Sequence, residues 1–151
     1  MIWTIRPATP ADTDTLAWIY LQSRQQHFVW QNPADFQRTD FAQHAEGEQI
    51  WLAQDDQGRI AGFVSIWAPT HFIHMLYVRS DFHGQGIGSA LLAALPGWTE
   101  RPWQLKCLVQ NGRVRRFYAT HGFVTTSQGQ SADGDYVLMT RPTFADDEHP
   151  F

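Results

Sequence analysis

The sequence predicts a mixed α/β fold in which one sheet carries helices on its faces. Seven segments have strand character and four have helix character, in the order β-α-α-β-β-β-α-β-α-β-β. The 151-residue chain is 43% hydrophobic and 17% charged, a composition typical of a globular domain. One strand, at 72–78, is apolar on both faces, as a central strand would be, and leads through a glycine-rich turn into a helix.

The first half supplies a strand, two helices and a hairpin, at residues 2–6, 12–26, 33–46, 49–54 and 59–67. Asp12 is a suitable N-cap for the first helix, and Pro33 suits the first position of the second. The Asp55–Gly58 segment has turn composition, which makes the strands on either side of it hairpin partners.

The second half continues with strands at 72–78, 103–109, 123–126 and 135–140 and helices at 89–95 and 111–121. Pro96 and Gly122 end the two helices, and Gly129 and Gly134 mark a turn between the last strands. We expect residues 1–141 to form one domain and residues 142–151 an acidic tail.

Composition argues against several classes of protein. The net charge of −4 and the pI of about 5.9 oppose general nucleic-acid binding. No stretch approaches the roughly 20 apolar residues of a membrane helix, and Met1–Pro10 lacks the apolar region of a signal peptide, so we expect a cytoplasmic protein. Basic residues gather at 101–121, which fits either a bound anion or a solvated helix face.

The segment His83–Gly88 has glycine at every second position, between the central strand and a helix. Such a loop lets backbone N–H groups approach a ligand, and the helix dipole favours a negative one, so the segment suits a pyrophosphate. Ser89–Ala90 excludes a Walker A motif, and Ser89 stands where the dinucleotide fingerprint needs glycine. A plain turn into a helix is the alternative.

Two stretches together resemble the GNAT superfamily of N-acetyltransferases. One is LYVRSDFHGQGIGSALL, from Leu76 to Leu92, with His83 where the family has Arg or Gln. The other begins at Asn111 and continues through Phe117–Tyr118 to Gly122–Phe123. The resemblance covers roughly residues 2–141 and implies a central mixed, mostly antiparallel sheet of about seven strands flanked by about four helices.

The resemblance implies acetyl-CoA as acetyl donor, without a metal, and direct attack by an amine in a ternary complex. Tyr118 would protonate the departing thiolate, which suits a phenol. A backbone N–H near Leu76 would stabilise the oxyanion. The residues that would bind the cofactor are Leu76, Tyr77, Val78, His83, Gly84, Gln85, Gly86, Ile87, Gly88, Ser89, Asn111, Arg116 and Phe117.

The general base is open at this stage, because Met75 stands where many relatives have glutamate. His74 is one candidate, and a water relay to a backbone carbonyl or to Asp135 is another. His71 and His74 would point to opposite faces of a strand, so they do not form a metal pair. Cys107, the only cysteine, looks like a core residue.

Phe28, Trp30 and Tyr136 are candidates for the wall of the acceptor site, because aromatic faces attract ammonium groups. Packing between the first two helices would explain Phe28 and Trp30 equally well. The acceptor would be the amine of a small molecule or of a protein, and the family resemblance allows a homodimer. Two other functions stay open: a non-catalytic acetyl-CoA-binding module, and an unrelated α/β domain whose loop binds a nucleotide.

Overall fold

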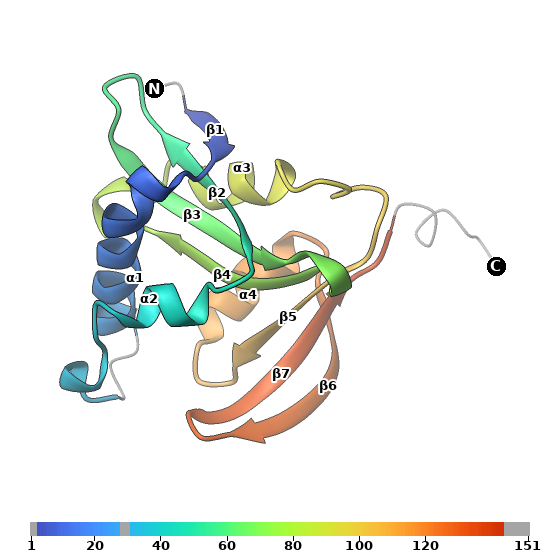
Figure 1. Cartoon of the computed structure of the whole chain (residues 1–151). Helices are drawn as coiled ribbons and strands as arrows, with labels where there is room; N and C mark the ends of the chain where they lie inside the picture. Colours follow the sequence, from blue (N-terminus) through green and yellow to red (C-terminus); the bar gives the residue numbers. More distant parts are fainter. Residues whose placement is uncertain (1–2, 28–30, 144–151) are drawn as a thin grey trace.

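The computed structural model describes residues 3–27 and 31–143, which build one seven-stranded sheet (Figure 1). The strands lie in the order β1-β2-β3-β4-β5-β7-β6, and only the β4–β5 pair is parallel. Their bounds are β1 Thr4–Pro7, β2 Gln49–Gln54, β3 Ile60–Trp67, β4 Phe72–Val78, β5 Trp103–Leu108, β6 Val124–Ser131 and β7 Gly134–Arg141. This is the mixed, mostly antiparallel sheet that the sequence predicts.

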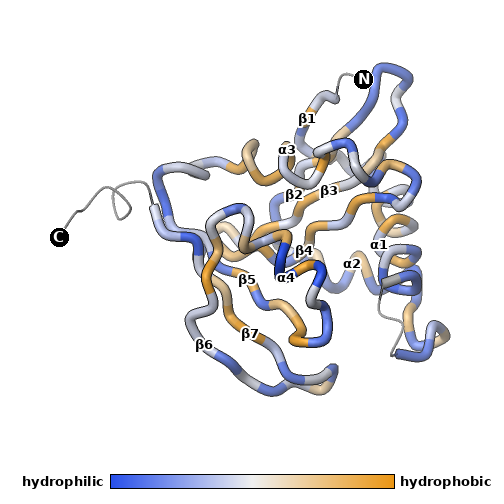
Figure 2. Tube along the Cα trace, turned by 180° about the vertical axis from the view of Figure 1, so that it is seen from behind, coloured by the Kyte–Doolittle hydropathy of each residue, from blue (hydrophilic) through white to orange (hydrophobic). Residues whose placement is uncertain are grey.

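Helices cover both faces of the sheet (Figures 1 and 2). Their bounds are α1 Thr13–His27, α2 Asp40–His44, α3 Ile87–Ala93 and α4 Gly112–Thr120. Under α1 and α2 the core contains Leu16, Ile19, Phe41, Phe63 and Met75. Under α3 and α4 it contains Ile73, Leu91, Leu105, Tyr118 and Val137. Strand β4 supplies both cores, because an irregularity in its pairing with β3 turns Ile73 and Met75 to opposite faces.

The parallel strands β4 and β5 diverge soon after they begin. Within the described residues they pair only at Phe72 with Gln104 and Ile73 with Leu105. From Met75 to Val78 β4 keeps its antiparallel partner β3, whereas in the described part of the chain its other edge is no longer paired with β5, which leaves a gap between the two strands. Unpaired backbone groups on an open strand edge can hydrogen-bond an extended ligand.

The predicted second helix is wrong in its length. A single 3₁₀ turn, Pro33–Asp35, is separated from α2 by an irregular segment. The Asp40 carboxylate accepts the Gln37 N–H at 2.9 Å, and buried Arg24 donates to the Gln37 carbonyl at 3.3 Å. These side-chain contacts replace the bonds that a continuous helix would make.

The last hairpin is longer than predicted, because Gly129 lies inside β6 and marks no turn. A Cβ at Gly129 would collide with the ring of Tyr136 on the neighbouring strand, so the glycine leaves room for that ring. Figure 2 shows β7 largely in hydrophobic colour, whereas the edge strand β6 is mostly polar and exposed.

Helix α3 begins at Ile87, two residues earlier than predicted. No helix among the described residues has the length and apolarity that crossing a membrane requires.

Candidate active site

The edge of β4 that faces the gap carries the backbone groups of Leu76 and Val78. Arg79 N–H donates to Ala61 O on β3 at 2.8 Å. Because an antiparallel strand turns alternate residues toward opposite edges, the N–H and C=O groups of Leu76 and Val78 point away from β3. The side chain of Tyr77, between them, packs on the α1 face against Tyr20 and Phe63.

The glycine loop follows the open end of this edge. His83 Nε2–H donates to Val78 O at 2.8 Å and so links the loop to β4. Gly84 and Gly86 have φ of 81° and 75°, a left-handed conformation that favours glycine, and a Cβ at either would meet nothing within 4 Å. Open space therefore lies beside the backbone of both glycines, as a phosphate cradle requires.

Helices α3 and α4 pack closely behind the loop. A Cβ at Gly88 would come within 3.1 Å of the Phe117 ring. Ser89 Oγ contacts His121 Nε2 at 2.8 Å, while His121 Nδ1–H donates to Phe117 O at 2.8 Å. The Ser89 hydroxyl therefore takes part in the contact between the two helices.

Two further predicted cofactor contacts, Asn111 and Arg116, flank the first turn of α4. Asn111 is the residue before the helix, and Arg116 is exposed on it.

Tyr118 lies on the α4 side of the sheet and interacts electrostatically with Tyr77 on β4 and with Cys107 on β5, the two strands that border the gap. It is buried against Phe117 and Phe123 with edge-to-face ring contacts at 5.3 and 5.5 Å. Burial, and less so the neighbouring Cys107, raises the pKa of Tyr118 far above its usual range, so the phenol keeps its proton at neutral pH. A protonated phenol beside the gap can donate to a leaving group placed there.

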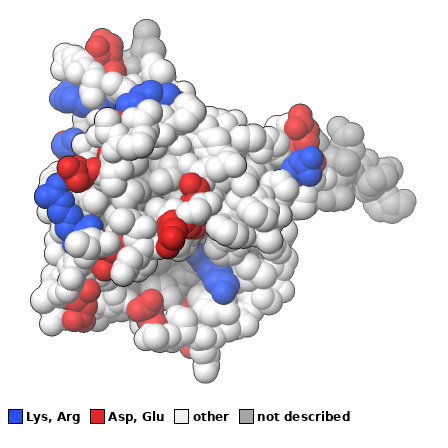
Figure 3. Space-filling model, viewed as in Figure 1, with Lys and Arg blue, Asp and Glu red and all other residues white. Residues whose placement is uncertain are grey.

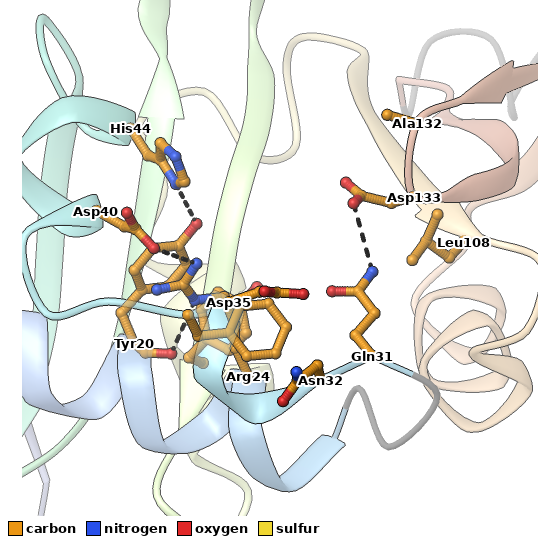
Figure 4. A pocket seen from close by; sticks show the side chains of 12 residues that line it. Tyr20, Arg24, Gln31, Asn32, Asp35, Asp40, His44, Leu108, Ala132 and Asp133 are labelled. Atoms are coloured by element: carbon orange, nitrogen blue, oxygen red, sulfur yellow. Dashed lines mark hydrogen bonds and ion pairs between the residues drawn. The ribbon is translucent and has the colours of Figure 1, made fainter.

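The α1 side of the gap opens into a cavity of about 860 Å³. One wall comes from α1, α2 and the segment between them, the other from the β6–β7 hairpin, and the floor from β4 and β5 (Figure 4). The lining residues are Tyr20, Arg24, Gln31, Asn32, Asp35, Phe36, Asp40, His44, Tyr77, Leu108, Ala132 and Asp133. We call this cavity the acceptor pocket.

The acceptor pocket has a surplus of negative charge. Arg24, stacked 3.8 Å from the centroid of the Tyr20 ring, neutralises Asp40 through an ion pair at 3.2 Å. The Gln37 N–H, and then Arg24, lower the pKa of Asp40, so that carboxylate stays ionised. Asp35 and Asp133 add two further carboxylates from opposite walls (Figure 4). Acidic side chains are spread over this face of the molecule (Figure 3).

Only one of the three predicted acceptor residues, Tyr136, lies among the described residues. Phe28 and Trp30 lie outside the described residues. Tyr136 faces the same side of the sheet as Leu108 but does not line the acceptor pocket, and the Lys106 ammonium lies 4.8 Å from the centroid of its ring. From this hairpin the pocket wall contains Asp133, at the tip, instead of Tyr136.

His74, the predicted base candidate, lies on the α1–α2 face, where β4 leaves β5. Its Nδ1 is 2.6 Å from the Glu48 carboxylate, and its side chain is 39% exposed. The sequence placed the loop at 128–136, which contains Asp133, beside the acceptor but did not single out that residue, and it missed Glu48 as well as Tyr20, Arg24, Asp35 and His44 in the pocket wall. The acidic surplus of residues 1–60 was the available signal for this part of the site, and it identifies no individual residue.

Neither a metal centre nor a nucleophilic cysteine is evident. Among residues 3–27 and 31–143, no group of three or more His, Cys, Asp or Glu side chains could hold a metal ion. Cys107 is buried in β5, and burial raises the pKa of its thiol to about 11. A thiol with that pKa is almost fully protonated, and therefore a poor nucleophile, at neutral pH.

The chain is similar in sequence to a known protein family and to a known enzyme. The family described as "Acetyltransferase (GNAT) domain" matches residues 46–125. An aminoglycoside N(6')-acetyltransferase type 1 of Stenotrophomonas maltophilia is 33% identical over 109 residues, which are 64% of this chain and 67% of that protein.

Two solved structures share the fold. A GCN5-related N-acetyltransferase of Rhodopseudomonas palustris has a TM-score of 0.75 and 23% identity, over 94% of this chain and 98% of that one. The PaiA N-acetyltransferase of Thermoplasma acidophilum, solved in complex with coenzyme A, has a TM-score of 0.74 and 19% identity, over 94% and 99%.

Proposed function

Because this chain belongs to the GNAT acetyltransferase family and is an acyl-CoA-dependent N-acetyltransferase, we propose that it acetylates a primary amine that enters through the acceptor pocket. One observation carries the proposal: Tyr118 lies on one face of the sheet at the strands β4 and β5, and the acceptor pocket lies on the other face at the same two strands. Two substrates could therefore meet there from opposite sides.

The described residues fit acetyl-CoA as the donor. The open backbone edge at Leu76 and Val78 suits the amide groups of a pantetheine arm. The open space at Gly84 and Gly86 suits a pyrophosphate, which the first N–H groups of α3 would also face. Asn111, just before α4, and Arg116 and Phe117 on α4 complete the proposed binding surface.

We assign the chemistry to three groups. Acetyl-CoA supplies an acetyl group activated as a thioester. His74 Nε2 takes a proton from the ammonium so that the amine can attack, and Leu76 N–H donates to the carbonyl oxygen as negative charge develops on it. Tyr118 O–H then donates its proton to the departing sulfur, which leaves as the thiol of coenzyme A, and the resulting phenolate is reprotonated by the proton that the newly acetylated nitrogen loses.

The acceptor we propose carries further positive charge beyond the reacting amine. Among residues 3–27 and 31–143, Asp35 and Asp133 face the pocket without an arginine partner such as Asp40 has. The rings of Tyr20 and Phe36 border the same space, but the Arg24 guanidinium already lies over both, at 3.8 and 4.9 Å from their centroids, so the carboxylates are the groups that would bind the added charge. The similarity to an aminoglycoside N(6')-acetyltransferase supports placing aminoglycosides beside simple diamines in an acceptor screen.

A thermal-shift titration tests the donor site. Acetyl-CoA should raise the melting temperature, with about 2.7 kcal/mol of stabilisation at one hundred times its dissociation constant, while ATP and NAD should not. Gly86→Val should abolish the shift, since valine is strained at a φ of 75° and its side chain would enter the cradle. Gly58→Val is the matched control, because Gly58 has a φ of 82° in the distant β2–β3 turn.

Thiol release with a panel of amines tests catalysis. Polyamines and aminoglycosides should release coenzyme A faster than monoamines at equal concentration. A protein that binds acetyl-CoA but releases no thiol with any amine would instead be a non-catalytic binding module. A shift with ATP or NAD alone would contradict the donor site.

A further inference from the structure

We infer that Glu48 is a positioning residue for acetyl transfer, because its carboxylate holds His74 in the tautomer that leaves Nε2 free to take the proton of the acceptor amine. The inference rests on the proposed function and adds a residue to it. Glu48 lies between α2 and β2, apart from both family motifs.

His74 lies where the pairing of β4 with β3 is interrupted and its pairing with β5 has ended. Ser65 on β3 pairs with Met75 and Ile66 pairs with Ile73, so His74 is an extra residue on β4, a β-bulge. Pairing with β5 also ends at Ile73. His74 is therefore the first residue of β4 at the gap, where the bulge directs its side chain to the α1–α2 face.

The residues that His74 contacts show that its side chain lies on the α1–α2 face. Phe63, two residues before Ser65 on β3, belongs to the core under α1 and α2, so Ser65 points to the same face. Ser65 and His74 both contact Glu48 there. The acceptor pocket opens on this face as well, with Tyr77 on β4 in its floor.

Glu48 uses both of its carboxylate oxygens. Ser65 Oγ–H donates to Oε1 at 2.5 Å, and His74 Nδ1 lies 2.6 Å from Oε2. The Glu48 side chain is only 7% exposed and Ser65 is fully buried, whereas the imidazole of His74 is 39% exposed. A buried serine thus fixes the carboxylate, and the carboxylate fixes one end of a ring whose other end remains accessible.

The chemistry of the contact determines the tautomer. An ionised carboxylate can only accept a hydrogen bond, so His74 Nδ1 must carry the hydrogen. In the neutral ring Nε2 then holds a lone pair and can accept a proton.

His44, which lines the acceptor pocket, has a different kind of partner. Its Nδ1 lies 2.7 Å from the Tyr20 hydroxyl. Burial raises the pKa of Tyr20, so the phenol keeps its proton, but a neutral phenol can either donate to Nδ1 or accept a hydrogen bond from it. This contact therefore selects no tautomer of His44, whereas the carboxylate of Glu48 selects that of His74.

The decisive experiment combines kinetics with nuclear magnetic resonance. Glu48→Gln keeps the size of the side chain but removes the charge that selects the tautomer. We expect kcat to fall about 10-fold to 100-fold, the loss typical of residues that orient a functional histidine, with little change in KM for acetyl-CoA. Glu46→Gln, the same substitution at an exposed position two residues away, should leave kcat unchanged.

The ¹⁵N chemical shifts of His74 provide a readout that does not depend on activity. The wild-type ring should show hydrogen on Nδ1, and Glu48→Gln should move the population toward hydrogen on Nε2. A wild-type His74 with its hydrogen on Nε2 overturns the inference, even if the variant does not fold. So does a folded Glu48→Gln protein with wild-type kcat. Absence of transferase activity in the wild type would instead contradict the proposed function, and the tautomer would still be measurable.

Discussion

At the scale of single residues, the proposed general acid gives a sharp expectation. Tyr118→Phe removes one oxygen and keeps the ring that packs on Phe117 and Phe123. We expect kcat to fall about 100-fold, a typical contribution of a general acid. The acetyl-CoA-dependent thermal shift should be retained. Steady-state kinetics with a fixed amine acceptor measure the effect, and a variant with unchanged kcat would rule out Tyr118 as the acid.

Cys107, which interacts electrostatically with Tyr118, provides the control for that variant. Its thiol, with a pKa of about 11, should not react with iodoacetamide in the native protein at neutral pH. Cys107→Ala should therefore keep kcat within about twofold. An acetylated Cys107 detected by mass spectrometry after mixing with acetyl-CoA would contradict direct transfer in a ternary complex.

Residues of the two proposed substrate sites differ in how far the sequence reveals them. Tyr118 and the glycine loop lie in contiguous motifs, so their positions could be read directly. The acceptor pocket depends on contacts between distant segments, such as Gln31 with Asp133, which are 102 residues apart. The pairing of Glu48 with His74 depends on a bulge in β4, which no local pattern announces.

At the scale of the elements, Gly62 on β3 holds β4 in place beside the gap. A Cβ at Gly62 would come within 2.6 Å of Tyr77 O and 3.0 Å of Val78 Cα. Gly62→Ala should displace the end of β4, at a cost of about 1–3 kcal/mol in the free energy of unfolding. It should also weaken acetyl-CoA binding, because Val78 carries part of the proposed edge.

Urea denaturation and the acetyl-CoA titration measure the two effects of Gly62→Ala separately. Ala61→Gly, on the same strand, is a useful comparison: it also perturbs the strand, but it introduces no atom toward β4. A Gly62→Ala protein with wild-type stability and wild-type affinity would show that β4 has room to move.

Strands and helices were predictable where the pattern of apolar residues decides them. The β2–β3 hairpin follows from its turn residues, and the central strand β4 follows from its apolar run. The divergence of β4 from β5 was not readable in this way, because pairing between strands is set by packing of the whole sheet. The segment between Asp35 and Asp40 is not helical, contrary to the prediction, because Arg24 on α1 donates a hydrogen bond to its backbone.

At the scale of the whole molecule, stability depends on a buried carboxylate near the start of the chain. Arg6 on β1 donates two hydrogen bonds, at 2.9 and 3.0 Å, to Asp12, which also accepts the Thr9 N–H. These contacts, the hydrogen bonds from Arg6 foremost, lower the pKa of Asp12 far below its usual range. The link fastens the first strand to the start of α1, and Asp12 is 9% exposed.

The lowered pKa of Asp12 determines how the free energy of unfolding changes with pH. Because the folded state binds the Asp12 proton less readily than the unfolded chain, the stabilisation is present above about pH 4 and is lost as the pH falls below that value. Asp12→Asn should cost about 1–3 kcal/mol at pH 7, and the difference from wild type should shrink toward pH 3. Urea denaturation across this range measures the difference in the free energy of unfolding.

Asp81→Asn is the control, because Asp81 also pairs with an arginine but is 58% exposed, and this substitution should cost less than about 1 kcal/mol. Equal effects of the two substitutions at pH 7 would show that burial of the Arg6–Asp12 pair does not determine its contribution.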